Sequence, residues 1–133
     1  MIPAFDQNGY LPPGIHTATI EEIEGIFGSG SEIRRVQMDS LRWLMELVSQ
    51  ASVLRIVLNG SWVTSEPEPG DVDCVLLAGR DWGKNPEIEQ QMQDGLPFIS
   101  PQIANQEVFD SFVSHVFASD RVHRPRGIIE VIR

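Results

Sequence analysis

Cysteine is nearly missing from this sequence, which has a single one, Cys74, in 133 residues. One cysteine can neither close an intramolecular disulfide nor build a cysteine-rich zinc site, so both kinds of scaffold are excluded. Long apolar runs are missing as well, since none reaches the roughly 18 residues that a membrane-spanning helix needs. The first 13 residues contain three prolines in place of a continuous apolar stretch, so we expect no secretory signal peptide.

Basic side chains are also scarce. Ten Lys and Arg stand against nineteen Asp and Glu, which gives a formal net charge of −9. A chain of this sign is repelled by nucleic-acid phosphates and anionic lipids, which excludes a protein that coats double-stranded DNA or lies on a membrane. The shares of apolar and charged residues, 41% and 22%, are those of a globular protein. We therefore expect one cytoplasmic domain over residues 1–133.

Hydrophobic periodicity and turn residues predict the order of the helices and strands. Residues 1–18 are expected to form an extended N-terminal arm, because Asn8-Gly9 and Pro12-Pro13-Gly14 interrupt any helix there. Helices are predicted over residues 20–27, 31–51, 86–94 and 105–118, and strands over residues 53–58, 71–77, 96–103 and 127–132. The expected N-caps are Thr19 with Glu22 as a capping box, Ser31, Asn85 and Asn105. This alternation predicts an α/β (α+β) domain, a small mixed β-sheet flanked by helices.

One segment has a pattern typical of a chemical site. Gly60-Ser61 ends the first predicted strand, and after nine intervening residues Asp71-Val72-Asp73 opens the second. Aspartates two positions apart on a strand point to the same face, where their charges repel unless a cation compensates them. Mg²⁺ suits such a pair, because it prefers carboxylate, phosphate and water oxygens. The glycine permits close approach of the backbone to a phosphate, and the serine can donate a hydrogen bond to it.

This pattern resembles the signature of the DNA polymerase β-type nucleotidyltransferase superfamily, in which an apolar residue and Gly-Ser precede a spaced Asp-x-Asp. The match is literal at Gly60, Ser61, Asp71 and Asp73 and covers roughly 40 residues around them. The opening segments, Ile2–Asp6 and Leu11–His16, also resemble a group of small uncharacterised bacterial proteins of that superfamily. The resemblance implies a single nucleotidyltransferase-like domain.

The resemblance further implies Mg²⁺-dependent transfer of a nucleoside monophosphate from an NTP to a hydroxyl group, with release of pyrophosphate. Asp71 and Asp73 would bind two Mg²⁺ ions, which Mn²⁺ can replace, and Gly60 with Ser61 would hold the β and γ phosphates. The acceptor is an RNA end or a protein, and small relatives often belong to toxin–antitoxin or phage-defence systems. A protein partner or self-association stays open.

The sequence departs from the superfamily pattern at the third carboxylate. The strand predicted over residues 96–103 contains no acid, and Ser100 or Gln102 stands where an aspartate is expected. Glu130 has suitable apolar neighbours but belongs to the last predicted strand, one element too late. Glu130 is therefore our candidate for the third catalytic acid, and the alternative is a catalytically inactive nucleotidyltransferase-like module that binds or regulates.

Each of these residues also has a plainer interpretation. The Asp71/Asp73 pair could be a solvated strand start, and Glu130 a surface residue of a half-exposed strand. Cys74 lies opposite the aspartates and should be a buried small hydrophobe, while Trp62 could stack on a base or close the core. The basic cluster of residues 121–126 is either a solvated loop or a patch that steers a triphosphate or an RNA end.

Overall fold

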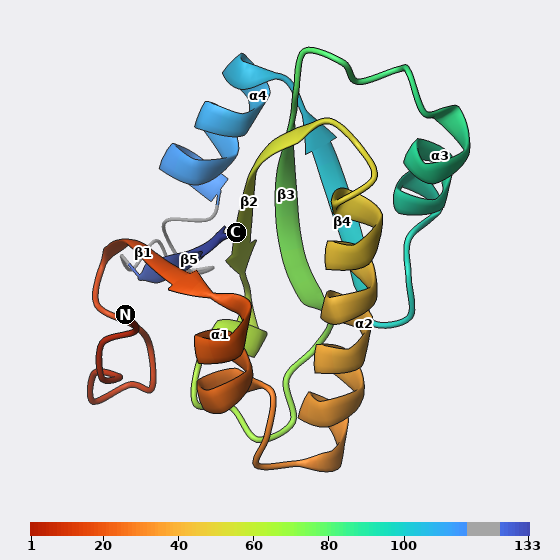
Figure 1. Cartoon of the computed structure of the whole chain (residues 1–133). Coiled ribbons are helices and arrows are strands. Elements are labelled where there is room, and N and C mark those ends of the chain that lie inside the picture. Colours follow the sequence, from red (N-terminus) through yellow and green to blue (C-terminus); the bar gives the residue numbers. More distant parts are fainter. Residues whose placement is uncertain (117–125) are drawn as a thin grey trace.

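A computed structural model describes residues 1–116 and 126–133 and shows a five-stranded mixed sheet with helices on both faces (Figure 1). The strands are β1 (Gly14–Thr19), β2 (Val53–Asn59), β3 (Val72–Ala78), β4 (Ile99–Ala104) and β5 (Gly127–Ile132). The helices are α1 (Ile20–Phe27), α2 (Glu32–Val48), α3 (Pro86–Asp94) and α4 (Gln106–Ser111), with a 3₁₀ turn η1 (Ser61–Val63) and a π-helical turn η2 (Phe112–Val116). The predicted mixed α/β domain is confirmed.

The strands lie in the order β1-β5-β2-β3-β4. The central strand β2 runs antiparallel to both of its neighbours, β3 and β5, whereas the two outer pairs, β1 with β5 and β3 with β4, are parallel. The C-terminal end of β2 therefore lies beside the N-terminal ends of β3 and β5. Three chain segments that are distant in sequence meet at this end of the sheet.

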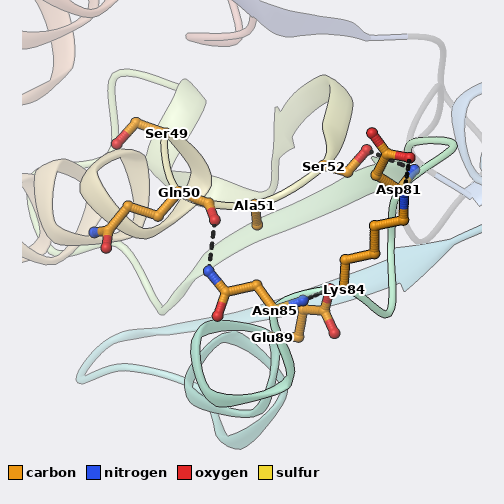
Figure 2. A pocket seen from close by; sticks show the side chains of 8 residues that line it. All are labelled: Ser49, Gln50, Ala51, Ser52, Asp81, Lys84, Asn85 and Glu89. Carbon is orange, nitrogen blue, oxygen red and sulfur yellow. Dashed lines mark hydrogen bonds and ion pairs between the residues drawn. The ribbon is translucent and has the colours of Figure 1, made fainter.

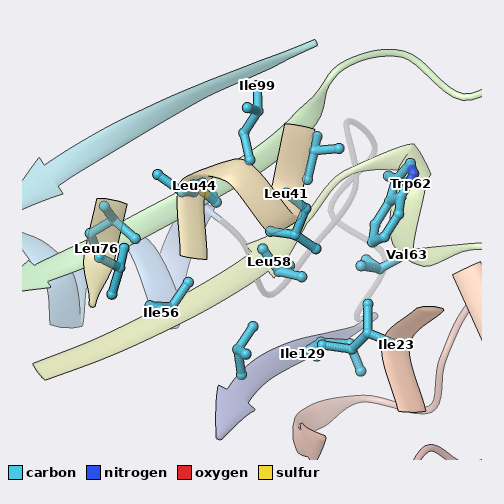
Figure 3. Packing of buried hydrophobic residues seen from close by; sticks show 14 of the residues in the cluster. Ile23, Leu41, Leu44, Ile56, Leu58, Trp62, Val63, Leu76, Ile99 and Ile129 are labelled. Carbon is cyan, nitrogen blue, oxygen red and sulfur yellow. The ribbon is translucent and has the colours of Figure 1, made fainter. Parts of the chain in front are cut away.

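The main hydrophobic core lies between the sheet and helices α1 and α2. Leu41 and Leu44 from α2 pack on Ile56, Leu58 and other side chains that alternate toward this face of the strands (Figure 3). These residues are fully buried, as β-branched and leucine side chains are in a well-packed interior. The spacing of apolar residues along residues 31–51 thus predicted the buried face of α2 correctly.

A smaller core lies on the opposite face of the sheet. There Phe109 of α4 packs on Val57, Val75 and Leu77, which alternate with the residues of the main core. The described part of α4 is short, and η2 continues it to residue 116. The last two residues of the helix predicted over 105–118 lie outside the described residues. No helix within residues 1–116 and 126–133 combines the length and apolarity that crossing a membrane requires.

The segment expected to form an extended N-terminal arm ends in a strand that was not predicted, because Gly14–Thr19 is β1 and pairs in parallel with β5. Only Ala18 of this strand is buried, so β1 lacks the apolar alternation by which a strand is recognised. The N–H of Gly127 donates to the carbonyl of Leu11 at 3.0 Å, which fixes the start of the pairing. This contact joins segments more than a hundred residues apart, which local sequence patterns do not encode.

Three of the four predicted N-caps are confirmed. Thr19 and Glu22 form the capping box, and the side chains of Ser31 and Asn105 accept backbone N–H bonds at 3.2 and 2.9 Å. Asn85 precedes α3 but makes no capping bond, since its amide donates to the carbonyl of Gln50 at 2.9 Å. The prolines predicted an edge or bulged strand, and β4 is an edge strand.

Arg34, near the N-terminus of α2, fastens the loop that follows β2. Its side chain is 5% exposed, and its guanidinium donates only to main-chain carbonyls. Nη1 bonds Phe27 and Trp62 at 3.0 and 2.8 Å, Nη2 bonds Thr64 and Glu66 at 2.7 Å each, and Nε bonds Glu66 at 3.0 Å. All five N–H groups of the guanidinium thus donate hydrogen bonds. Burial lowers the pKa of this guanidinium, and the negative charge of Glu66 works in the opposite direction.

Gln37, one turn further along α2, extends the attachment. It is 1% exposed, and its amide donates to the carbonyls of Pro69 and Gly70 at 3.3 and 2.8 Å. Arg34 and Gln37 therefore hold both ends of residues 62–70, a segment that has no ladder bonds of its own. Polar residues at the inward positions of an amphipathic helix are the sequence signal for such a role.

We expect Arg34→Met to lower the free energy of unfolding by about 3 kcal/mol or more, because four carbonyls would lose a charged donor. Urea denaturation of the purified variant measures this. Arg35→Met is the matched control, since Arg35 is the adjacent residue and is exposed. Equal stability of the two variants would contradict the structural role of Arg34.

Candidate functional site

The structure brings together the four residues of the Gly-Ser and Asp-x-Asp pattern. Asn59, the last residue of β2, is directly opposite Asp73 in the antiparallel pairing with β3. Gly60 and Ser61 continue from β2, while Asp71 immediately precedes β3, so all four lie at one end of the sheet. The hairpin-like return predicted over residues 67–70 brings the start of β3 beside the end of β2. The charge of Asp71 is close enough to act on the carboxylate of Asp73.

Gly60 brings the backbone after β2 close to the carboxylate of Asp73. Its φ of 86° and ψ of −171° lie in a region that is accessible essentially to glycine alone. A Cβ atom built on Gly60 would lie 2.4 Å from Oδ2 of Asp73, well inside van der Waals contact. Glycine is therefore required here both by the backbone conformation and by the position of the aspartate.

Ser61 begins the 3₁₀ turn η1 and has a structural contact. Its hydroxyl oxygen accepts the N–H of Gly70 at 2.9 Å, which closes the loop between β2 and β3. Its carbonyl accepts both the N–H and the hydroxyl of Thr64, at 3.3 and 2.5 Å. The hydroxyl of Ser61 still has a proton to donate, and N–H groups at the start of a helical turn lack acceptors within that turn.

Asp73 has an outer edge exposed to solvent, but Gly60 and Asn59 flank its inner side. Removal of water raises the pKa of its carboxyl group, the charge of Asp71 raises it further, and the positive charge of Arg126 works in the opposite direction. The ionised form of Asp73 is therefore less favoured in the protein than in a free aspartate. An added cation next to the carboxylate would reverse this balance.

The sheet places a row of polar residues across three strands at this end. Asn59, Asp73 and Ser100 are register neighbours on β2, β3 and β4, and they share the face on which α4 packs. Phe109 of α4 covers the apolar residues that follow Asp73 along β3. The polar row is thus next to the small core and outside it.

Asn59 was not predicted as a site residue, although it belongs to the quoted motif. It is 4% exposed, and its Oδ1 is buried without a hydrogen-bond partner among the described residues. A buried acceptor without a donor costs about 1–3 kcal/mol, so a hydrogen-bond donor placed beside Asp73 would stabilise this site.

Trp62 and Cys74 have structural roles. Trp62 is fully buried, with its ring 5.7 Å from that of Phe27, so it closes the main core and cannot stack on a base. Cys74 is 1% exposed within the same core, as predicted, and burial raises the pKa of its thiol, which the charge of Asp73 also does. A thiol in this state is not a nucleophile.

The structure does not bring Glu130 to the aspartates. It lies on the same sheet face but on β5, two strands and two residues from Asp73, which the spacings of a sheet put at roughly 12 Å. Both carboxylate oxygens bind Arg55, at 2.9 and 2.6 Å, and the guanidinium lies 4.9 Å above the ring of Phe109. This ion pair is the observed role of Glu130.

Strand β4 has no carboxylate beside the aspartates. Ser100 is the residue of β4 directly beside Asp73, and Gln102 lies beside Val75. Within the described part of the chain, no group of three or more His, Cys, Asp or Glu side chains could hold a metal ion. A cation at this site would therefore have two carboxylates, Asp71 and Asp73, and would need further oxygen ligands from elsewhere.

Of the predicted basic cluster, residues 121–125 lie outside the described residues, and Arg126 lies at the start of β5. Its guanidinium is 5.8 Å from the ring centroid of Tyr10. Its Nε is buried and has no hydrogen-bond partner among the described residues. Arg126 is therefore a cation at the same end of the sheet as the aspartates.

A separate hollow of about 500 Å³ lies at the opposite end of β2, between the end of α2 and the start of α3 (Figure 2). Its polar groups bond one another: Lys84 pairs with Asp81 at 3.1 Å, and Glu89 accepts the N–H groups of Gly83 and Asn85 at 2.7 and 3.3 Å. These bonds organise the loop before α3. None of the predicted site residues lines this hollow.

Comparison with protein families assigns the chain to a family but gives no activity for it. Residues 3–132 match the DUF6932 family, which is described as a family of unknown function. The chain belongs to this family. No curated protein and no solved structure matches it. The function of this DUF6932 member must therefore be inferred from the site itself.

Gly60→Ala should destabilise the protein by about 1–3 kcal/mol, because alanine is strained at this φ and its Cβ would clash with Asp73. Gly25→Ala is the control, since Gly25 lies inside α1 with open space around its Cα and alanine favours helix. Thermal unfolding compares the two variants. A stable Gly60→Ala protein would show that the loop after β2 is not fixed in this conformation.

Glu130→Gln should lower stability by about 1 kcal/mol, because it breaks a two-bond ion pair with Arg55. Binding of Mg²⁺ with an NTP should be retained, since Glu130 does not reach the aspartates. Calorimetric titration and urea denaturation measure the two effects. Loss of binding in a folded variant would restore Glu130 as a residue of the site.

Proposed function

We propose that this protein binds an NTP with Mg²⁺ through Asp71, Asp73, Gly60 and Ser61, and transfers the nucleoside monophosphate to a hydroxyl acceptor. The observation that carries the proposal is the contact of Asp73 with Gly60, which joins a carboxylate pair to a phosphate-compatible backbone. The resemblance of the motif to the nucleotidyltransferase superfamily supports it. The raised pKa of Asp73 supports a site that is completed by a cation.

The residues present fit a hard divalent cation. Asp71 and Asp73 supply carboxylate oxygens, and the missing Cβ of Gly60 lets the carboxylate of Asp73 lie close to the backbone after β2. Bound Mg²⁺ would neutralise triphosphate charge and lower the pKa of the acceptor hydroxyl. Ser61 would donate its hydroxyl proton to a phosphate oxygen, while Arg34 and Gln37 keep its loop in place. Catalysis by such a site depends on positioning and charge neutralisation.

A second candidate function is nucleotide binding without transfer, as a regulatory module. The engagement of Glu130 by Arg55 and the presence of Ser100 beside Asp73 favour it, because both leave the site without a third carboxylate. Both functions require binding of the nucleotide, but only the first consumes it. Pyrophosphate release from NTPs in the presence of RNA or protein acceptors supports transfer, and binding without release supports the module.

The acceptor in this proposal is an RNA end or a protein side chain, and the setting is a toxin–antitoxin or phage-defence system. Because an NTP is the donor, the proposed location is the cytoplasm.

Asp73→Asn should abolish binding of Mg²⁺-NTP, because one of the two carboxylates is lost and a neutral amide is a weaker ligand. The fold should persist, and without metal at pH 7 the variant should melt at the same or a higher temperature. The reason is that a raised pKa makes ionised Asp73 destabilise the fold at pH values above that pKa. The difference in melting temperature between the variant and the unmodified protein should therefore shrink as pH falls through this pKa. Calorimetric titration and thermal melts across pH measure both.

Asp39→Asn is the matched control, since Asp39 is an exposed residue of α2 and the charge change is the same. We expect it to bind Mg²⁺-NTP as the unmodified protein does. If Asp73→Asn retains binding, or if the folded unmodified protein binds none of the four NTPs, the proposed function is wrong.

A further inference from the structure

Arg126 is placed by the sheet at the same end and on the same face as Asp73. Strand β5 runs antiparallel to β2, with Leu58 opposite Ile129, so the start of β5 lies at the end of β2. Side chains alternate along a strand, and Ile128 belongs to the small core on the face of Asp73. Two residues earlier, Arg126 falls on that face, and its charge is felt by the Asp73 carboxylate.

The guanidinium of Arg126 lies near an aromatic ring, and one of its donors has no partner among the described residues. The ring of Tyr10, from the N-terminal arm, lies 5.8 Å from its central carbon, which is within the range of a cation–π interaction. Its Nε is buried and makes no hydrogen bond within residues 1–116 and 126–133. In contrast, Nε of the buried Arg34 donates to the carbonyl of Glu66, and Nε of Arg55 donates to Glu130.

A second unpartnered group lies in the same place. Asn59, directly opposite Asp73, is 4% exposed and has a buried Oδ1 without a donor. A buried donor and a buried acceptor thus flank the aspartates, and each lacks a partner among the described residues. Native proteins leave few such atoms unsatisfied, and a bound ion, water or ligand is one explanation for those that exist.

We propose that Arg126 binds the phosphate groups of the nucleotide at the Asp71/Asp73 site, with Tyr10 as the platform that orients its guanidinium. A guanidinium matches a phosphate better than an ammonium does, because its planar N–H groups bond two oxygens at once. Without nucleotide, the same charge partly neutralises Asp73. This inference rests on the proposed function and adds an anion-binding residue to it.

The experiment compares Arg126→Gln with the unmodified protein by calorimetric titration with two probes: inorganic tripolyphosphate with Mg²⁺, and Mn²⁺ alone. Arg126→Gln should weaken tripolyphosphate binding by roughly tenfold or more, as loss of a charged hydrogen bond does. Binding of Mn²⁺ alone should be equal or tighter, because a competing positive charge has been removed. Loss of tripolyphosphate affinity with Mn²⁺ affinity retained distinguishes a phosphate ligand from a general loss of structure.

Two further variants complete the test. Arg126→Lys retains the charge without the planar fork, so its affinity for tripolyphosphate should fall between those of the unmodified protein and Arg126→Gln. Arg80→Gln removes the same charge from an exposed loop at the far end of β3 and should bind as the unmodified protein does.

Each failure has its own signature. If the unmodified protein binds Mg²⁺-tripolyphosphate and Arg126→Gln binds it equally well, the role of Arg126 is wrong and the proposed function stands. If the folded, unmodified protein binds neither Mg²⁺-tripolyphosphate nor any Mg²⁺-NTP, the proposed function fails, and the role of Arg126 fails with it.

Discussion

The hydrogen bonds from Arg34 to main-chain carbonyls are the constraint on which the candidate site depends. Residues 60–71 connect β2 to β3 and have no strand pairing to fix their course. Arg34 donates to the carbonyls of Trp62, Thr64 and Glu66 in this segment. The guanidinium in α2 thus supplies hydrogen bonds that a paired strand would otherwise supply. Burying a charge is costly unless it is fully hydrogen-bonded, and here each N–H has an acceptor.

The two faces of the sheet differ next to this attached segment. On the α1/α2 face, Trp62 and Arg34 are buried, so the turn after Gly60 cannot shift without disturbing the main core. On the α4 face, the same stretch of sheet carries Asn59 and Asp73, beside the small core formed with Phe109. A rigid backbone beneath exposed carboxylates is the arrangement that positions ligands accurately.

Local patterns in the sequence were sufficient for most of the fold. The capping box at Thr19, the apolar row of α2 and the proline-marked edge strand β4 each follow from interactions within a few residues. Strand β1 was missed because its only support is pairing with β5, at the other end of the chain. A strand with one buried side chain leaves no periodicity to detect.

The candidate site was predictable to the same extent. The motif placed Gly60 beside Asp73 because a strand, a tight loop and a return strand leave little freedom in register. The sequence could not show that Glu130 is bound by Arg55, since Arg55 lies on the neighbouring strand β2, whose pairing with β5 joins distant segments. It could not show Arg34 either, because whether a helical arginine faces solvent or a loop depends on where that loop passes.

The charge balance of the site has a consequence for the order of binding. Two carboxylates are available at the start of β3, one of them with a raised pKa, and Glu130 is bound to Arg55. A divalent cation held by Asp71 and Asp73 alone would keep most of its water, and phosphate oxygens would have to complete its coordination. The cation and the triphosphate would then bind as one unit, because each supplies what the other lacks. Affinity for the metal alone would be low in such a site, even where the metal–nucleotide complex binds well.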